Sequence, residues 1–370
     1  MEENPKKSSN KKRKKMMKKS DEEADRLSAL PEPLLHNILS FLDMKEVVQT
    51  SFISKKWRYF WKSLPFLNFD YSLWNASSKK KKQHPSPYVQ KVFTKQKCLN
   101  FVDGVLLFRD NSSPIEKIHI TQSYACDSLR LSKWLLFVAS RHVKEVQIDF
   151  DKSCKVVTLP DLLFTSHVEV LKLTGNHWIS VQLPGLSSPA KKLRSLILVY
   201  VKLPNGNSNG ELDFNYPLLE NLVLILCDLQ HIKKLKVTTP QLKNLVVECG
   251  YNGEINISAP KLLSVKLNAH QFKIHYVEKL SSLVSATIDI TAFTLQSESM
   301  LQVLEGLQTV TTLQINGHYK ELLLLNPFSN LRCFKLMGMC RSSCIQALGN
   351  FLKSSPSLET LVLDECSRLI

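Results

Sequence analysis

The sequence predicts an α/β solenoid built from parallel strands, preceded by a small three-helix unit and a disordered basic tail at the N-terminus. Three observations carry this prediction. Lysines crowd the first residues, helical periodicity follows between about residues 31 and 61, and a six-residue apolar frame recurs from residue 64 onward. The 370-residue chain is 44% hydrophobic, which suffices for a large core. Its longest apolar runs fall short of the ~18 residues that span a bilayer, so no membrane association is expected.

The N-terminal tail, residues 1–24, is dominated by lysine and arginine. The first 19 residues carry nine of these side chains, against only Glu2 and Glu3. Like charges repel and nothing in this stretch can form a core, so it is expected to be disordered. Such a run is typical of a nuclear-import signal, and the alternative is a solvated tail with weak affinity for polyanions. The nine cysteines include no Cys-x-x-Cys pair, which favours reduced thiols in the nucleus or cytoplasm.

Residues 25–63 are predicted to form three short helices. The first begins near Pro31, Asp43 caps the second, and Ser54 caps the third. Such a unit is too small to be stable alone and needs a partner or an adjoining domain to cover its apolar face. The apolar residues at helical spacing are Leu34, Leu35, Ile38, Leu39 and Leu42 in the first helix, Val47 and Val48 in the second, and Trp57, Phe60 and Trp61 in the third.

From residue 64 to residue 370 a six-residue frame recurs with apolar residues at its first, fourth and sixth positions. This L-x-x-L-x-L pattern, repeated every 20–28 residues, is the signature of a leucine-rich repeat and predicts a horseshoe with parallel strands. The frames begin at Leu64, Ile115, Val143, Val168, Leu193, Leu219, Leu242, Leu262, Leu283, Val310, Leu331 and Leu358.

Two segments interrupt the repeats. Residues 71–96 carry six lysines, no acidic residue and two prolines, and are predicted to form a flexible insert. Residues 205–211, rich in asparagine and glycine, are predicted to form a second, shorter loop.

The third, fifth and seventh frame positions are expected to line the concave face of the horseshoe. Polar Lys172 and Lys266 flank an apolar group in the central repeats, which is typical of a protein-binding surface. A register shifted by one residue, or a simple strand preference of β-branched residues, is the alternative. The predicted target-binding residues are Ile197, Val199, Val223, Ile225 and Val246.

The ninth frame position often holds an asparagine or cysteine that bonds to backbone in the turn after the strand. Asn176, Cys227 and Cys366 occupy it here, which gives the two cysteines structural roles. The chain contains no glycine-rich phosphate loop, Gly-x-Ser-x-Gly elbow or His-Glu-x-x-His motif, so neither an enzyme nor a bound cofactor or metal is expected.

The formal net charge of +16 resides mostly in two segments. The first 19 residues and residues 71–97 each carry +7, which leaves the rest of the chain near +2. A nucleic-acid-binding fold concentrates lysine and arginine on one face of its structured part, so this distribution argues against nucleic acid as the partner.

The N-terminal segment resembles an F-box of the plant type. The resemblance rests on the Leu30-Pro31 start, the Ile-Leu-Ser-Phe-Leu segment that ends at Leu42, and the Ser54-Lys-Lys-Trp57-Arg ending. With repeats behind it, nearly everything after residue 24 is similar to the F-box/leucine-rich-repeat (F-box/LRR) family. Pro33 departs from the pattern, because the family more often has an acid or other helix former there.

The resemblance implies a substrate-recognition subunit of an SCF-type ubiquitin ligase. The F-box would bind a Skp-family adaptor and, through it, a cullin scaffold, while the repeats would bind an unknown target protein. A non-degradative, adaptor-bound scaffold is the alternative, and a small-molecule co-ligand stays open. The residues expected to contact the adaptor are Leu30, Pro31, Leu35, Ile38, Leu39, Leu42, Val47, Val48 and Trp57, some of which must instead pack the helical core.

Overall fold

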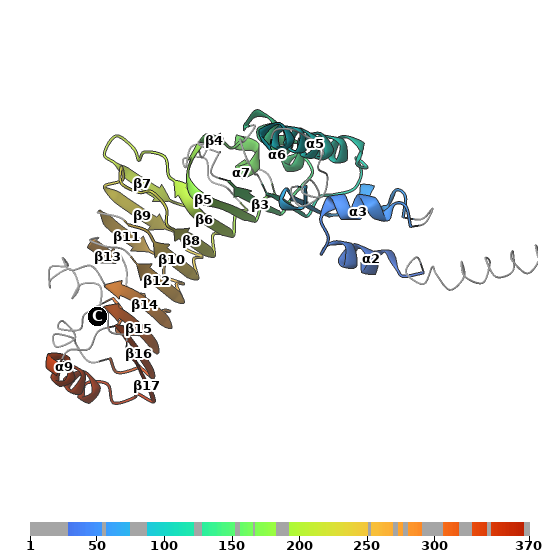
Figure 1. Ribbon diagram of the computed structural model, residues 1–370. Coiled ribbons are helices and arrows are strands. Elements are labelled where there is room, and N and C mark those ends of the chain that lie inside the picture. The colour runs from blue at the N-terminus through green and yellow to red at the C-terminus, as the bar shows by residue number, and fades with distance from the viewer. Residues whose placement is uncertain are drawn as a thin grey trace, which may run out of the picture. The chain divides into compact units, whose positions relative to one another are not determined.

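The computed structural model describes two compact units, one up to Ile120 and one from Thr121 onward (Figure 1). The predicted tail (1–24), Ser54 and Cys366 lie outside the described residues. The described residues are 29–53, 57–74, 87–121, 128–151, 156–165, 167–182, 192–250, 253–268, 273–276, 280–290, 306–317, 328–338 and 342–365.

The first unit begins with two helices, α2 (Glu32–Leu39) and α3 (Met44–Thr50). Pro31 occupies the N-cap of α2, so Pro33 falls in the first turn, where a missing N–H group costs little. Asp43 caps α3 as predicted, and Glu46 completes a capping box by accepting the Asp43 N–H. Where the third helix is predicted, the described residues 57–63 contain the 3-10 turn η1 (Phe60–Lys62) and no α-helix.

The core of the first unit joins these helices to strand β1 (Phe66–Asp70). The Phe60 ring lies 4.8 Å from His36 and 6.2 Å from Trp57, measured between ring centroids. The alternating burial of β1 places Leu67 and Phe69 in the interior. The helical segment 25–63 therefore covers its apolar side partly with residues that follow it, as its small size requires.

The first unit also contains helix α5 (Pro87–Phe108) and strand β2 (Lys117–Thr121). The predicted flexible insert 71–96 is thus wrong from Pro87 onward, and residues 75–86 lie outside the described part of the chain. Pro87 suits the first turn of a helix, and buried Cys98, Val102 and Val105 follow at helical spacing. The lysines obscured this periodicity in the sequence, and of those in α5 Lys97 is exposed and Lys95 is half-buried.

The second unit is a solenoid whose main sheet is entirely parallel (Figure 1). Its strands run in the order β3-β5-β6-β8-β10-β12-β14-β15-β16-β17, and each begins two residues after a predicted frame start. The predicted repeat architecture is confirmed. The strands are β3 (Glu145–Phe150), β5 (Val170–Gln182), β6 (Ser195–Lys202), β8 (Asn221–Ile225), β10 (Asn244–Glu248), β12 (Ser264–Asn268), β14 (Ser285–Ile290), β15 (Thr312–Gly317), β16 (Cys333–Gly338) and β17 (Thr360–Glu365).

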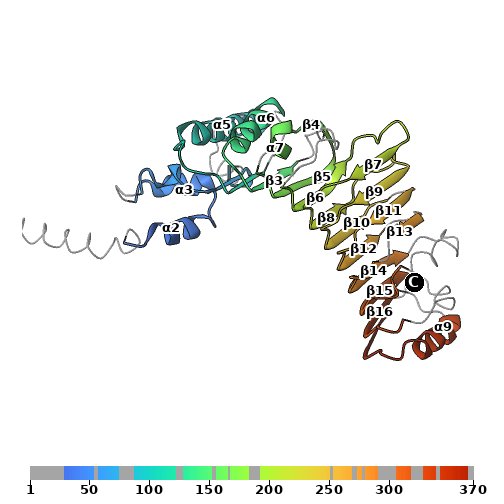
Figure 2. The same cartoon turned by 180° about the vertical axis from the view of Figure 1, so that it is seen from behind.

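A second parallel sheet, which the frame did not predict, runs beside the main one (Figure 2). Its strand order is β13-β11-β9-β7. Each turn of the solenoid in this region therefore contributes one strand to the main sheet and one to the second sheet. Its outer face carries alternating charges, with Lys236 bonded to Glu211 at 2.9 Å and Lys234 paired with Glu254 at 3.3 Å. The strands are β7 (Glu211–Phe214), β9 (Lys234–Thr238), β11 (Glu254–Ser258) and β13 (Lys273–Tyr276).

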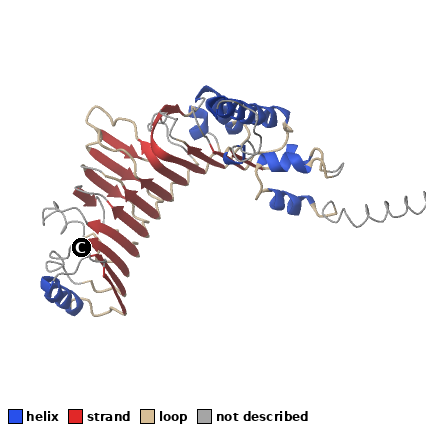
Figure 3. Ribbon diagram, viewed as in Figure 1, coloured by secondary structure: helices blue, strands red, loops and turns tan. Residues whose placement is uncertain are grey.

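Few helices accompany the solenoid in the part of the chain that the structure describes (Figure 3). They are α6 (Ser128–Ala139), α7 (Asp161–Thr165) and α9 (Ser342–Lys353), and a short strand, β4 (Val156–Thr158), pairs with β5. The predicted short loop is a turn in which the Asn207 side chain accepts the backbone N–H of Glu211 at 2.9 Å. Gly210 supplies a positive φ of 77° directly before β7.

The predicted structural role of the ninth frame position holds for Cys227 but not for Asn176. Cys227 is buried, and its thiol donates to the Leu198 carbonyl at 3.3 Å. In the next turn Cys249 donates in the same way to the Leu224 carbonyl at 3.4 Å. Asn176 is exposed and donates to the Asp151 carboxylate, because an irregularity in β5 carries it out of the turn.

Candidate interaction surfaces

Helix α2 divides its apolar residues between two faces. Leu35 and Leu39 are buried, whereas Leu34, Ile38 and, just beyond the end of the helix, Phe41 are exposed. The exposed fraction reaches 46% at Ile38 and 82% at Phe41. The exposed side of α2, together with exposed Pro31, is therefore an apolar stripe with no cover from the described residues.

A second apolar group follows α3. Phe52 is 91% exposed, and its neighbour Ile53 is 60% exposed. Large apolar side chains exposed to this degree are unusual in a folded monomer and are typical of a surface that a partner covers.

The structure separates the predicted adaptor-contact residues into core and surface. Leu35, Leu39, Val47 and Trp57 are buried in the chain's own core, which removes them from the candidate contact surface. Pro31 and Ile38 are exposed, while Leu30, Leu42 and Val48 are half-buried. Sequence reasoning did not assign Leu34, Phe41, Phe52 or Ile53 to this surface.

The predicted concave group lies on one face of the main sheet. Ile197 pairs in register with Val223, which pairs with Val246, and Val199 pairs with Ile225. All five are half-buried, while the alternate residues of the same strands point into the core. The register is therefore the predicted one. We call Ile197, Val199, Val223, Ile225 and Val246 the concave patch.

Lysines flank the concave patch on both sides. Lys172 on β5 pairs in register with Ile197, and Lys266 on β12 pairs in register with Val246. Lys266 also forms an ion pair with Glu248. In the part of the chain that the structure describes, no ion pair involves Lys172.

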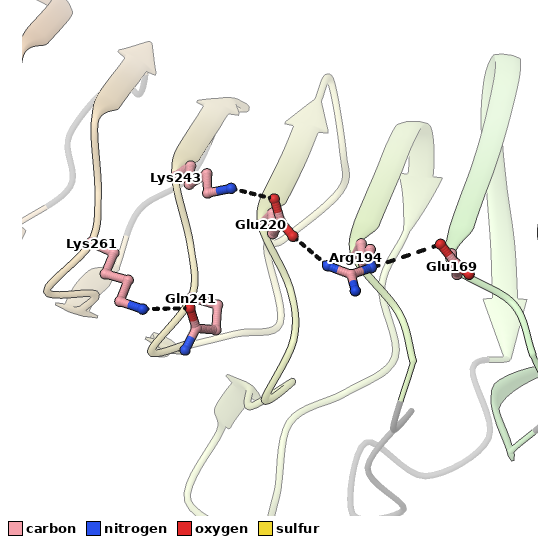
Figure 4. A network of polar contacts seen from close by, with 6 residues as sticks. All are labelled: Glu169, Arg194, Glu220, Gln241, Lys243 and Lys261. Carbon is pink, nitrogen blue, oxygen red and sulfur yellow. Dashed lines mark hydrogen bonds and ion pairs between the residues drawn. The ribbon is translucent and has the colours of Figure 1, made fainter.

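An ion-pair network runs along the amino ends of the same strands (Figure 4). The Arg194 guanidinium lies 3.7 Å from Glu169 and 2.6 Å from Glu220, and the Lys243 ammonium also lies 2.6 Å from Glu220. Hydrogen bonds from Lys243 and Arg194 lower the pKa of Glu220 below its ordinary value. The apolar concave patch is thus bordered by a charge-compensated rim.

Metal binding and membrane insertion find no support in the described part of the chain. It contains no group of three or more His, Cys, Asp or Glu side chains placed to hold a metal ion. None of its helices is both long and apolar enough to cross a bilayer.

Comparisons with known proteins match two separate segments of the chain. A family model described as F-box domain matches residues 27–69, and one described as At1g61320/AtMIF1, LRR domain matches residues 112–368. An Arabidopsis thaliana F-box/LRR-repeat protein is 29% identical over 296 residues, which cover 78% of this chain and 89% of the relative. Another F-box/LRR-repeat protein of the same plant is 28% identical, with coverage of 92% and 69%. An F-box/FBD/LRR-repeat protein is also 28% identical, but the match covers only 60% of its length.

Proposed function

Because the chain belongs to the F-box/leucine-rich-repeat family, we propose that it is a substrate-recognition subunit of an SCF-type ubiquitin ligase. The observation that carries the proposal is the exposed apolar stripe on α2, within a segment that matches the F-box domain. An F-box binds a Skp-family adaptor, and the adaptor would connect this chain to a cullin scaffold.

The adaptor would cover the apolar side chains that the chain itself leaves exposed. Burial of apolar surface yields about 25 cal/mol per Å², so several large side chains suffice for a stable contact. The half-buried Leu30, Leu42 and Val48 would lie at the border of this contact. The central contact residues proposed here are Pro31, Leu34, Ile38, Phe41, Phe52 and Ile53.

The repeats would hold the target protein, with the concave patch as the contact surface. Catalysis then rests on proximity, because a tethered target keeps its lysines near the ubiquitin-charged enzyme at a raised local concentration. The receptor contributes no bond chemistry of its own in this mechanism.

Adaptor binding by the full chain tests the proposal. The variant Ile38→Ala/Phe41→Ala should bind a purified Skp-family adaptor at least tenfold more weakly than the unaltered chain, with unchanged circular dichroism. Phe108→Ala/Leu129→Ala is the matched control, since both residues are exposed but lie outside the F-box segment. Full adaptor binding by the first variant, or no adaptor binding by the unaltered chain, would contradict the proposal.

A further inference from the structure

Strand β5 contains a large bulge in its middle. Thr174 pairs with Val199 and Ile179 pairs with Val201, so residues 175–178 lie opposite the single residue Tyr200. A Cβ atom on Gly175 would lie only 2.6 Å from the His177 carbonyl oxygen. Glycine is therefore required for this backbone path, as at many bulges that redirect a side chain.

The bulge places Trp178 across the neighbouring strand. The indole N–H of Trp178 donates to the Leu226 carbonyl oxygen at 2.9 Å, although Leu226 follows β8 and β6 lies between β5 and β8. The tryptophan is nevertheless 54% exposed, and Leu226 is 45% exposed. Fixed at its polar edge and about half exposed, Trp178 has the form of a preorganised apolar anchor site.

The backbone beneath Trp178 is strained. Tyr200 and Leu226 have φ angles of 55° and 50°, which are rare for bulky residues. They follow directly after Val199 and Ile225 of the concave patch. Strain that the surrounding structure maintains is characteristic of binding surfaces. We call Trp178, Tyr200 and Leu226 the aromatic lip, which continues the concave patch at the carboxyl ends of the strands.

The charges beside Ile197 favour an acidic group at the β5 end of the patch. In the row of the sheet that contains Ile197, Val223 and Val246, the charged residues from β3 to β17 are Lys172, Lys266 and Lys335. The next row, which contains Val199 and Ile225, instead carries the acidic residues Asp149, Glu248, Asp289 and Asp364. Lys266 is compensated by Glu248, whereas Lys172 has no ion-pair partner among the described residues. An acidic side chain beside an apolar one would complement this end of the patch.

The distance between neighbouring strands determines how long a peptide segment would be that lies across the patch. Neighbouring strands lie about 4.8 Å apart, so the three steps from β5 through β6 and β8 to β10 span roughly 14 Å. An extended chain rises about 3.3 Å per residue and covers this distance in four or five residues.

We propose that the concave patch and the aromatic lip together bind a short acidic–apolar segment of the target protein. Apolar side chains of the segment pack on Ile197, Val223, Val246 and Trp178, and an aspartate or glutamate beside them pairs with Lys172. This proposal rests on the proposed function, because it specifies the target class that the receptor selects.

Selection from a random dodecapeptide display library, on the full chain without adaptor, tests the proposal. The enriched peptides should share an acidic residue within about five positions of large apolar residues. Trp178→Ala should weaken binding of a synthetic consensus peptide at least tenfold. Lys172→Glu should weaken it severalfold and, in a repeated selection, replace the acidic preference by a basic one.

Lys335→Glu is the matched control, because Lys335 belongs to the same row but lies far from the patch, and its binding should stay within twofold of the unaltered chain. No enriched consensus, a consensus without an acid, or insensitivity to Trp178→Ala would overturn the proposal. Adaptor binding measured on the same samples separates the two proposals. If the chain binds the adaptor but no peptide, only the proposal of an acidic–apolar target segment is contradicted. If it binds peptide but no adaptor, only the proposed ligase role is contradicted.

Discussion

The carboxylate of Asp43 accepts the backbone N–H of Asp70 at 2.6 Å, while its other oxygen accepts the N–H of Lys45 at 2.7 Å. One side chain therefore caps α3 and also holds the end of β1. The F-box helices and the strand that follows them are joined at this point by two charge-assisted hydrogen bonds.

We expect Asp43→Ala to destabilise the first unit by about 1–3 kcal/mol, since the substitution leaves two backbone donors without their acceptors. Amide hydrogen exchange of α3 and β1 would measure the loss. Asp110→Ala is the control, because Asp110 bonds to Ser112 in an exposed turn and should affect these amides less. Unchanged amide hydrogen exchange in Asp43→Ala would show that the two hydrogen bonds make no net contribution to stability.

The same carboxylate predicts a pH dependence of stability. Burial raises the pKa of Asp43 above its ordinary value of 3.8, despite its backbone hydrogen bonds. The native state therefore binds the proton more tightly than the unfolded state does. The stability that follows from this difference is largest at low pH and declines as the pH rises through the native pKa. The stability difference between the unaltered chain and Asp43→Ala should grow as the pH falls from about 7 to about 4. Urea unfolding across this range measures it, and a shrinking difference would contradict the assignment.

Cys98 should be unreactive in the native protein. Burial, followed by the nearby Asp43 carboxylate, raises the pKa of its thiol to about 12. Since the thiolate is the reactive form, iodoacetamide at about pH 8 should leave Cys98 unmodified while it alkylates the partly exposed Cys333. Mass spectrometry of native and denatured samples reports both sites. Equal rates at the two cysteines in the native protein would contradict the expected burial.

Gly175→Ala should lower the thermal midpoint and displace Trp178, because the added Cβ atom would meet backbone at 2.6 Å. A displaced indole loses its bond to Leu226, and its fluorescence should change. Gly250→Ala is the matched control, since nothing lies within 4 Å of the Cβ position there. Equal effects of the two substitutions would show that the bulge does not depend on glycine.

The rim network should be visible in the titration of Glu220. The hydrogen bond from Lys243 is the largest cause of its lowered pKa, followed by that from Arg194. Lys243→Ala should therefore raise the Glu220 pKa toward its ordinary value, as measured by carboxyl carbon NMR. The associated stability is present above the ordinary pKa and is lost as the pH falls through the lowered one. A Glu220 pKa that does not move in Lys243→Ala would exclude this ion pair in solution.

The sequence predicted the repeats better than the F-box surface, and the reason lies in the pattern itself. Each frame gives several buried positions, so the face of every main strand could be assigned. In α2, by contrast, Leu34 and Leu35 are adjacent, as are Ile38 and Leu39, and both sides of the helix are apolar. Over only eight residues, periodicity could not decide which member of each pair points inward.

The second sheet and the aromatic lip were missed for different reasons. The strands of the second sheet show a plain alternation, as in Leu212 and Phe214 or Ile255 and Ile257, which a search for the six-residue frame passes over. The lip depends on a bulge, which inserts residues that no repeat spacing anticipates. A glycine followed by polar and aromatic residues within an otherwise apolar strand was the only local signal.

The backbone pairing of β6, β8 and β10 and the inward leucines on either side of Val223 do not involve the side chain at position 223. A gene duplicate that exchanges Val223 or Ile197 for another side chain would therefore keep its architecture. The target preference of such a receptor can change through single substitutions of outward residues. The hydrogen bonds of Asp43 and the helices α2 and α3 need not change with it.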